Sequence, residues 1–176
     1  MSLRRLRLAP LVLAAVAALA LAWVAGAAPG WSAHDAAHDS APGVVSVTRQ
    51  ANRSSYGLGY PGSGGVVPDL AADANPVLGT TVQLLLTNPA ALPALAVFVA
   101  APESANLPTG HGGALLVEPD LAIGAFLPAG GMVLPMNVPA APQLLGATLH
   151  VQALSWDSGA RFGIAFSRGL RLTFGN

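Results

Sequence analysis

The sequence predicts an all-β protein: a single antiparallel β-sandwich of about eight strands, immunoglobulin-like or jelly-roll-like, preceded by an N-terminal signal helix and a flexible linker. Three observations predict the sandwich. From residue 56 onward, proline or glycine clusters recur every eight to fifteen residues and separate short apolar runs. Nine prolines between residues 89 and 142 leave no window for a long helix. Two of the runs alternate apolar and polar residues, as strands with one buried face do.

Several runs have the length and composition of strands. Alternation is clearest in 148–153 and 170–174, so we expect each of these to bury one face and to expose the other to water. Residues 84–86 and 96–99 are apolar without alternation, which is typical of strands covered on both sides. Pro135 lies inside a further run and predicts an edge or bulged strand, because proline donates no hydrogen bond to a sheet. The predicted strands are residues 80–87, 95–101, 114–118, 121–127, 132–138, 147–156, 162–167 and 170–174.

Residues 1–27 have the composition of a secretory signal peptide. The start is basic, an alanine-, leucine- and valine-rich run follows, and Ala25-Gly26-Ala27 offers the small residues that signal peptidase accepts. We therefore expect a secreted protein, extracellular or at the cell surface, which contacts the membrane only transiently through this segment. An uncleaved membrane anchor is the alternative, because the apolar run is nearly long enough to span a bilayer.

Residues 28–55 are predicted to be a flexible linker, and residues 56–176 the β-sandwich domain. The linker is rich in alanine, serine, aspartate and histidine and shows no sustained periodicity, although residues 44–48 could form one short strand. His34 and His38 are candidate metal ligands, because one helical turn would place both on the same face. No third ligand is evident, so a solvated linker is the favoured interpretation.

Charged residues are scarce. They make up only 9% of the chain, where about a quarter is usual. Lysine is absent, and the chain after residue 27 carries five arginines against eight acids, so no basic stripe suits a nucleic acid. Cysteine is absent too, which excludes disulfides and cysteine nucleophiles. A protein surface with so few charges is poorly protected against association with other molecules. The alternative interpretation is a compositional bias without functional meaning.

The stretch YGLGYPGSGG contains the pattern G-x-G-x-x-G at Gly57, Gly59 and Gly62. In a dinucleotide-binding loop this pattern opens a helix, whose free N–H groups hold the pyrophosphate. Pro61 and Pro68 prevent a helix here, and no acid follows at the distance of a ribose ligand. We interpret the stretch as a glycine-rich turn before the first core strand and expect no cofactor.

No residue pattern marks a catalytic centre. Ser63 resembles the serine of a nucleophile elbow, but Pro61 replaces the first glycine of G-x-S-x-G. His111, His150 and Asp157 are available for a triad, yet sequence spacing does not bring them together, and His150 is expected to be a solvated imidazole.

The acidic residues mark no glycosidase pair. Glu118-Pro119-Asp120 is interpreted as a hairpin turn, with calcium binding as the alternative. The protein is therefore not expected to be an enzyme.

Exposed aromatic rings near loops are candidates for stacking on sugars. Trp156 ends an alternating strand beside the turn Asp157-Ser158-Gly159, and Tyr60 lies in the glycine-rich stretch. These residues, Trp156, Tyr60 and Asp157, are the candidate ligand-binding residues. The favoured alternative for Trp156 is a ring that caps the core.

Glycine, proline and leucine motifs recur over residues 56–176, among them YGLGYPGSGGVVP, ALLVEP, LHVQA and the final SRGLRLT. They resemble an uncharacterised module of this length that recurs in secreted proteins of environmental bacteria, often at the C-terminus. Its members usually have a cysteine where Tyr60 stands and another just before the Leu-Leu-Val run, near residues 111–113. The resemblance implies an exported β domain without a known site, in which a cross-link is lost and Tyr60 packs in its place.

Together these features predict a secreted, non-catalytic structural or interaction module at the cell surface or in the extracellular matrix. Its expected partners are further copies of itself or components of the cell envelope. A carbohydrate-binding module, with polysaccharide bound near Trp156 and Tyr60, is the alternative.

Overall fold

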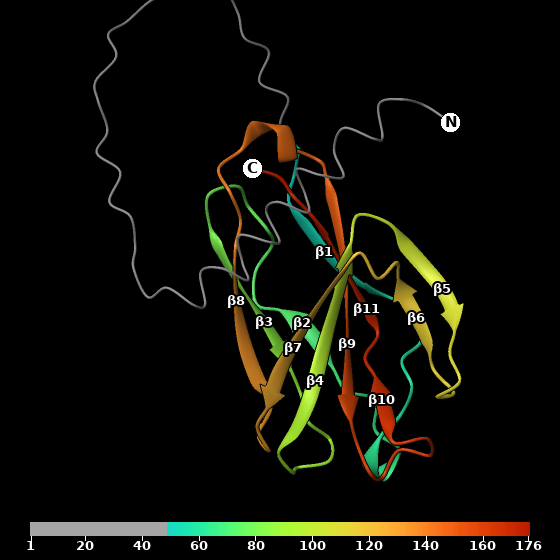
Figure 1. Ribbon diagram of the computed structural model, residues 1–176. Coiled ribbons are helices and arrows are strands. Elements are labelled where there is room, and N and C mark those ends of the chain that lie inside the picture. Colours follow the sequence, from blue (N-terminus) through green and yellow to red (C-terminus); the bar gives the residue numbers. More distant parts are fainter. Residues whose placement is uncertain (1–48) are drawn as a thin grey trace, which may run out of the picture.

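The computed structural model describes residues 49–176 (Figure 1). Over this range the chain forms eleven strands and two short 3-10 helices, η2 (Ser63–Gly65) and η3 (Pro142–Leu144). Every pair of strands is antiparallel. The predicted all-β class with antiparallel sheets is confirmed. No helix in this range has the length and hydrophobicity to cross a membrane.

The larger sheet has the strand order β1-β11-β9-β4-β7, with the short strand β10 also paired to β9. β7 and β1 are its two edges. β9 lies near the centre and pairs with three strands, because its first half faces β11, its second half faces β10, and its other side faces β4. The strands are β1 (Asn52–Tyr56), β4 (Ala94–Ala101), β7 (Leu121–Leu127), β9 (Thr148–Trp156), β10 (Ile164–Phe166) and β11 (Gly169–Thr173).

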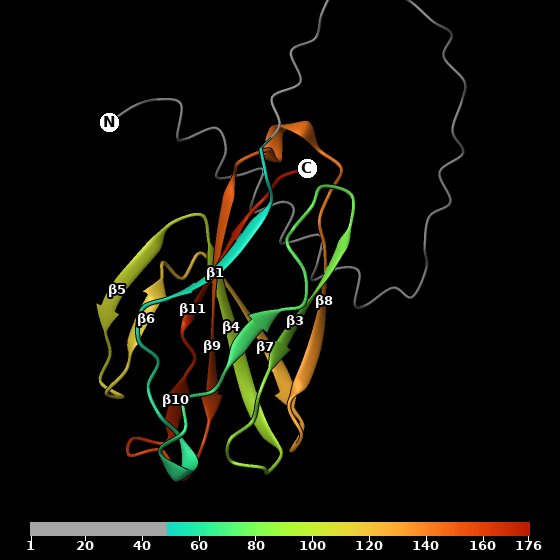
Figure 2. The same ribbon diagram turned by 180° about the vertical axis from the view of Figure 1, so that it is seen from behind.

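A smaller sheet of three strands faces the larger one, in the order β2 (Leu70–Ala72), β3 (Thr81–Leu86) and β8 (Met132–Asn137). Figure 2 shows the two sheets as separate layers from the opposite side. A third element, the hairpin of β5 (Ser104–Pro108) and β6 (Ala114–Val117), stands against the outer face of the larger sheet.

The main hydrophobic core fills the space between the two sheets. Phe98, Val151 and Leu172 contribute to it from the larger sheet, and Val82 and Leu84 from the smaller one. A second, smaller cluster of Val99, Ala101 and Val117 lies between the larger sheet and the β5–β6 hairpin. Burial of these apolar side chains stabilises the fold. Cysteine is absent, so neither disulfides nor cysteine-based metal sites add to this stability.

Each of the eight predicted strands corresponds to an observed one, with ends that differ by a few residues. Pro135 lies on β8, an edge of the smaller sheet, so the predicted edge position is confirmed. The sequence patterns missed β1, β2 and β5, because these strands are short or polar and lack an apolar period.

The predicted linker, residues 28–55, overlaps the folded part at its C-terminal end. β1 starts at Asn52 and pairs along its whole length with β11. Ala51 is buried, and the Asn176 amide donates a hydrogen bond to the Arg49 carbonyl at 2.9 Å. Residues 49–55 of the predicted linker therefore belong to the folded part. The earlier residues, including the predicted signal, the strand at 44–48 and the candidate ligands His34 and His38, lie outside the described residues.

The alternating sequence of β9 predicts that its polar face is exposed to water, and at Gln152 this prediction is wrong. Leu149 and Val151 face the main core as predicted, but Gln152 on the opposite face is fully buried under the β5–β6 hairpin. The side chain of Gln152 accepts a hydrogen bond from the Leu116 amide at 2.9 Å and donates to the carbonyls of Ala114 and Ser167. A buried amide needs such partners. They join the hairpin to the sheet.

Candidate functional site

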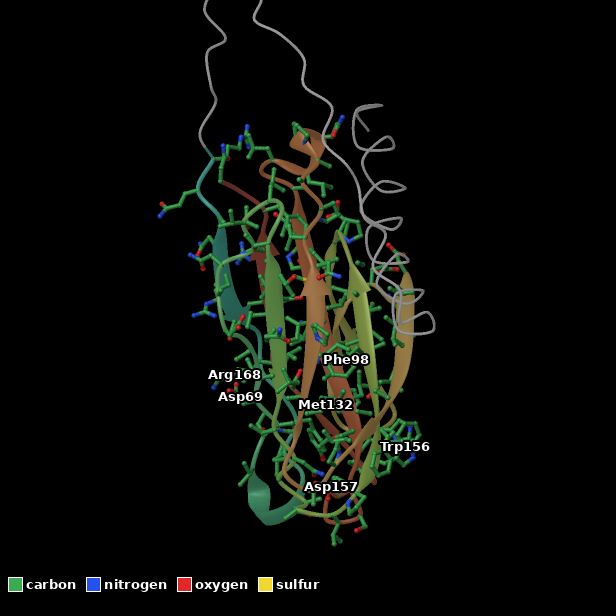
Figure 3. The ribbon with its side chains drawn as sticks, turned by 90° about the vertical axis from the view of Figure 1, so that its left-hand side faces the viewer. Asp69, Phe98, Met132, Trp156, Asp157 and Arg168 are labelled. Carbon is green, nitrogen blue, oxygen red and sulfur yellow. The ribbon has the colours of Figure 1, made fainter. Side chains whose placement is uncertain are left out.

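The predicted ligand-binding residues do not form one site. Trp156 and Asp157 are neighbours in sequence, but Trp156 is 51% exposed and Asp157 is 3% exposed. Figure 3 shows Trp156 pointing away from the domain, whereas Phe98 lies between the layers. Tyr60 lies beside β10, to which its backbone is paired through Phe166. Each of the three residues therefore has a different environment.

Asp157 ties the glycine-rich loop to the end of β9. Its carboxylate accepts hydrogen bonds from the Ser63 amide at 2.7 Å, from the Ser63 hydroxyl at 2.6 Å and from the Gly159 amide at 2.8 Å. A Cβ on Gly62 would collide with this carboxylate. Only a glycine at that position lets the loop approach so closely. The oxygens of Asp157 are thus engaged within the protein, and its predicted role in ligand binding stays a prediction.

The pKa of the Asp157 carboxyl is lowered. Burial alone raises it, but the hydrogen bonds from Ser63 and Gly159 favour the charged form and outweigh burial. The group is thus a stable anion that accepts hydrogen bonds. It is suited to holding a loop and poorly suited to taking a proton in a reaction.

The other residues considered for a triad lie elsewhere. No hydrogen bond joins Ser63 to a histidine within the described part of the chain. The ring of His111 contacts the Phe162 carbonyl at 3.4 Å, and that of His150 contacts the Pro102 carbonyl at 3.0 Å.

His150 is not the solvated imidazole that the sequence predicts. It is half-buried against the ring of Tyr56, with the ring centroids 5.3 Å apart and nearly perpendicular. Burial lowers the pKa of His150, although the Pro102 carbonyl opposes this effect.

No cluster of three or more potential metal ligands occurs between residues 49 and 176. Glu118-Pro119-Asp120, for which calcium binding was the alternative prediction, forms a tight turn between β6 and β7. The Asp120 amide donates a hydrogen bond to the Glu118 carbonyl at 2.9 Å and closes this turn. The prediction of a hairpin turn is wrong, because β6 pairs with β5 and β7 pairs with β4, so this turn does not join paired strands.

Tyr60 lines a groove of about 580 Å³ between the glycine-rich segment and the β5–β6 hairpin. We name it the glycine groove. Its floor and walls combine two aromatic rings, open glycine backbone and one exposed amide side chain. The lining residues are Tyr56, Gly57, Leu58, Gly59, Tyr60, Ala105, Asn106, Gly112, Gly113, Ala114 and Leu116.

Close packing holds this groove in shape. Tyr60 packs edge-on against Phe166, with centroids 6.3 Å apart. A Cβ on Gly112, whose φ is +81°, would lie 2.7 Å from the Tyr60 ring. The ring of Tyr60 and Gly112 are thus in contact. A bulge in β5 leaves Ala105 and Asn106 without register partners on β6.

Trp156 belongs to a second surface, which lies on the outer face of the larger sheet. Phe126 on β7 is directly opposite Leu95 on β4. The β4–β9 register pairs Ala96 with Ser155, and one position further places Leu95 opposite Trp156. Paired residues of neighbouring strands share a face of the sheet. Phe126, Leu95 and Trp156 therefore form a row across three strands, which we name the outer apolar row.

The outer apolar row is exposed because the hairpin covers only part of this face. The β5–β6 hairpin buries Val99 and Ala101, whereas Phe126 is 64% and Leu95 59% exposed. The three side chains of the row carry no charge. The favoured sequence interpretation of Trp156 as a cap of the core is wrong, and the alternative of an exposed ring is correct.

No sequence pattern marks Leu95 and Phe126 as surface residues. Residues 96–99 are apolar throughout, so no alternation revealed which members of β4 point outward. The register of β4 with β7 carries this information, because it places Phe126 and Leu95 on the face opposite to Phe98.

No protein-family model matches the chain, and neither a curated protein nor a solved structure matches it. The candidate sites are therefore interpreted from their own chemistry.

Proposed function

We propose that the two sheets form a single β-sandwich of the predicted immunoglobulin-like or jelly-roll type, which serves as a non-catalytic interaction module. The observation that supports this proposal is the outer apolar row. Transfer of a large apolar side chain out of water contributes about 1.5–3 kcal/mol. Three such side chains side by side therefore favour contact with another surface.

The composition and the N-terminal sequence support the same proposal. With charged residues at 9% and no lysine, few charges keep two copies apart. The signal-like residues 1–27 support export of the module to the cell surface or the extracellular matrix. Its partners are other copies of this chain or apolar components of the envelope.

The outer apolar row can be tested by a triple substitution, Leu95→Ser, Phe126→Ser and Trp156→Ser. A matched control replaces three exposed apolar side chains outside both the row and the glycine groove, Val66, Leu92 and Val133, by serine. We expect the wild-type protein and the control to sediment as associated species or to bind isolated envelope material. The row variant should lose this binding while its circular dichroism spectrum stays that of a β protein.

Kosmotropic salt separates apolar association from charge-driven association. Sulfate strengthens apolar burial, so it should increase binding by the wild-type protein. Equal binding by the row variant and the wild type, or no binding by either, would contradict the proposed function.

The glycine groove supports a second candidate function, the binding of polysaccharide. Tyr60 and Asn106 offer a ring face and an amide there, which are groups that contact sugars. Trp156 lies outside the groove lining, so only Tyr60 of the predicted aromatic pair would take part.

Calorimetric titration with soluble polysaccharides tests this second function. Asn106→Ala should weaken binding, since Asn106 is exposed and forms no side-chain hydrogen bond within the described residues. Trp156→Ala serves as the control and should bind normally. Heat of binding that depends on Trp156 and not on Asn106 would place the sugar elsewhere.

A further inference from the structure

The two sheets have four edges, and three of them carry features that discourage pairing with another chain. β1 is polar and contains Arg53, β2 has only three residues, and β8 contains Pro135. Charged side chains, short length and proline are the usual means by which proteins protect sheet edges. Only the fourth edge, β7, differs.

β7 is a long edge strand with none of these features. Its seven residues, LAIGAFL, contain no charged side chain and no proline. It pairs with β4 on one side, and no strand of residues 49–176 pairs with its other side. A long, apolar, uncharged edge presents a row of free backbone N–H and C=O groups, and these groups accept a further strand.

We propose that the β7 strands of two copies pair antiparallel across a two-fold axis at Gly124, so that the two larger sheets become one continuous sheet. This inference rests on the proposed function, because it names the partner and the surface of its self-association. The partner is a second copy because an antiparallel edge is complementary to itself about such an axis.

The side chains of β7 fit this register. Ala122, Gly124 and Phe126 lie on its outer face, so the only large side chain of that face is near one end. In the proposed pair, Phe126 of one copy lies opposite Ala122 of the second copy and beside its Gly124. The small residues leave room for the ring, and the pairing removes part of its exposed surface from water.

The charges near β7 also fit. Glu118 and Asp120 precede the strand, so antiparallel pairing places them at opposite ends of the interface. There they lie opposite the uncharged residues 128–130 of the second copy, and like charges do not meet. The outer apolar rows of the two copies are offset by four positions along β7, so Phe126 extends the row of its own copy onto Ala122 of the second copy.

The same geometry limits the size of the assembly. An isologous contact uses the same edge on both copies, so it closes at a dimer. A single pair of seven-residue strands buries little area compared with a permanent interface. We therefore expect a reversible dimer rather than a fibre.

Single cysteines test the register, because the chain has no cysteine of its own. Facing Cα atoms of antiparallel strands are about 4.5–5.5 Å apart, which lies within the range of a disulfide. Gly124→Cys should oxidise to a covalent dimer. Ala122→Cys and Phe126→Cys should cross-link when mixed, and much less when each is alone. Val133→Cys, exposed on the β8 edge, is the control and should stay monomeric.

Charges at the axis provide a second test. A Cβ added at Gly124 has no heavy atom within 4 Å, and the position is exposed, so we expect Gly124→Lys and Gly124→Glu to fold. Two like charges then face each other at the axis, and we expect the dimer dissociation constant to rise about tenfold or more. Mixing the two variants should restore association, because opposite charges then meet.

The outcomes separate this inference from the proposed function. Restored association in the mixture and selective cross-linking at Gly124 would support the β7 dimer. If both charged variants associate as the wild type does, the edge pairing is wrong, while association through the outer apolar row still stands. If the wild type binds only envelope material and remains monomeric, the edge pairing is also wrong. If the wild type neither associates nor binds envelope material, both proposals fail.

Discussion

Ser63 and Asp157 lie 94 positions apart in the sequence and are joined by two hydrogen bonds, one from the amide and one from the hydroxyl of Ser63. The contact fastens the glycine-rich loop to the turn after β9. Asp157 is nearly fully buried, so its charge depends on these donors. The loop that contains a dinucleotide-like pattern thus serves to close one end of the domain.

Removal of this carboxylate should destabilise the protein. Asp157→Ala leaves the Ser63 and Gly159 donors unpaired in a largely buried place, and each such loss costs about 1–3 kcal/mol. Chemical denaturation should therefore give a lower free energy of unfolding for Asp157→Ala. Asp120→Ala, which removes an exposed carboxylate, is the control and should change it little. Equal stability of the two variants would show that the contact contributes nothing.

Acid should weaken the wild-type protein through the same group. The pKa of Asp157 in the folded state lies below its ordinary value of 3.8. The folded state therefore binds this proton less readily than the unfolded state. The stabilisation is complete above pH 3.8 and is lost as the pH falls through the folded-state pKa. Asp157→Asn should show a flatter dependence of unfolding free energy on pH in this window.

Gln152 should be essential for attachment of the β5–β6 hairpin. Gln152→Ala leaves the Leu116 amide and two carbonyls without partners under the hairpin, and we expect a loss of about 2–4 kcal/mol in unfolding free energy. Hydrogen exchange should locate the effect, with faster exchange at the Leu116 amide than at Val82 in the main core. Uniform acceleration at both sites would indicate global destabilisation instead.

Tyr56 should ionise late. Burial raises the pKa of Tyr56 to about 12, although Arg171 lowers it in part, and the hydroxyl donates to the Leu116 carbonyl at 2.7 Å. Absorbance titration should resolve a phenolate step near this pH, and Tyr56→Phe should remove it. The ordinary pKa of tyrosine is 10.0, so the unfolded state loses this proton at a lower pH than the folded state does. The free energy of unfolding should therefore fall as the pH rises from 10.0 to about 12. If the phenolate step that Tyr56→Phe removes lies at the ordinary pKa of 10.0, the burial of Tyr56 is contradicted.

The N-terminal limit of the domain can be tested with two fragments. Residues 49–176 contain β1, whereas residues 57–176 lack it together with the buried Ala51. The five paired residues of β1 make about five backbone hydrogen bonds, so at about 1 kcal/mol each their loss should lower the unfolding free energy by about 5 kcal/mol. Thermal unfolding of the two fragments measures this difference. Identical melting curves would mean that β1 does not belong to the folded unit.

Local sequence patterns predicted much of the fold. The spacing of prolines and the short apolar runs predicted the all-β class and eight of the strands, because both signals depend only on neighbouring residues. Pro135 predicted an edge for the same local reason. β1 and β5 escaped prediction, since polar strands owe their structure to partners distant in sequence, such as β11 for β1.

What the sequence determined by itself was the class of the fold and the scarcity of charge, cysteine and catalytic patterns. Tertiary structure alone decided which side chains are exposed. Gln152 and Asp157 look like surface residues in the sequence and are buried, because the β5–β6 hairpin and the glycine-rich loop cover them. Leu95 and Phe126 look like core residues and are exposed, because strand register places them on the uncovered part of the outer face. Burial depends on contacts between segments far apart in the chain, and local patterns do not record those contacts.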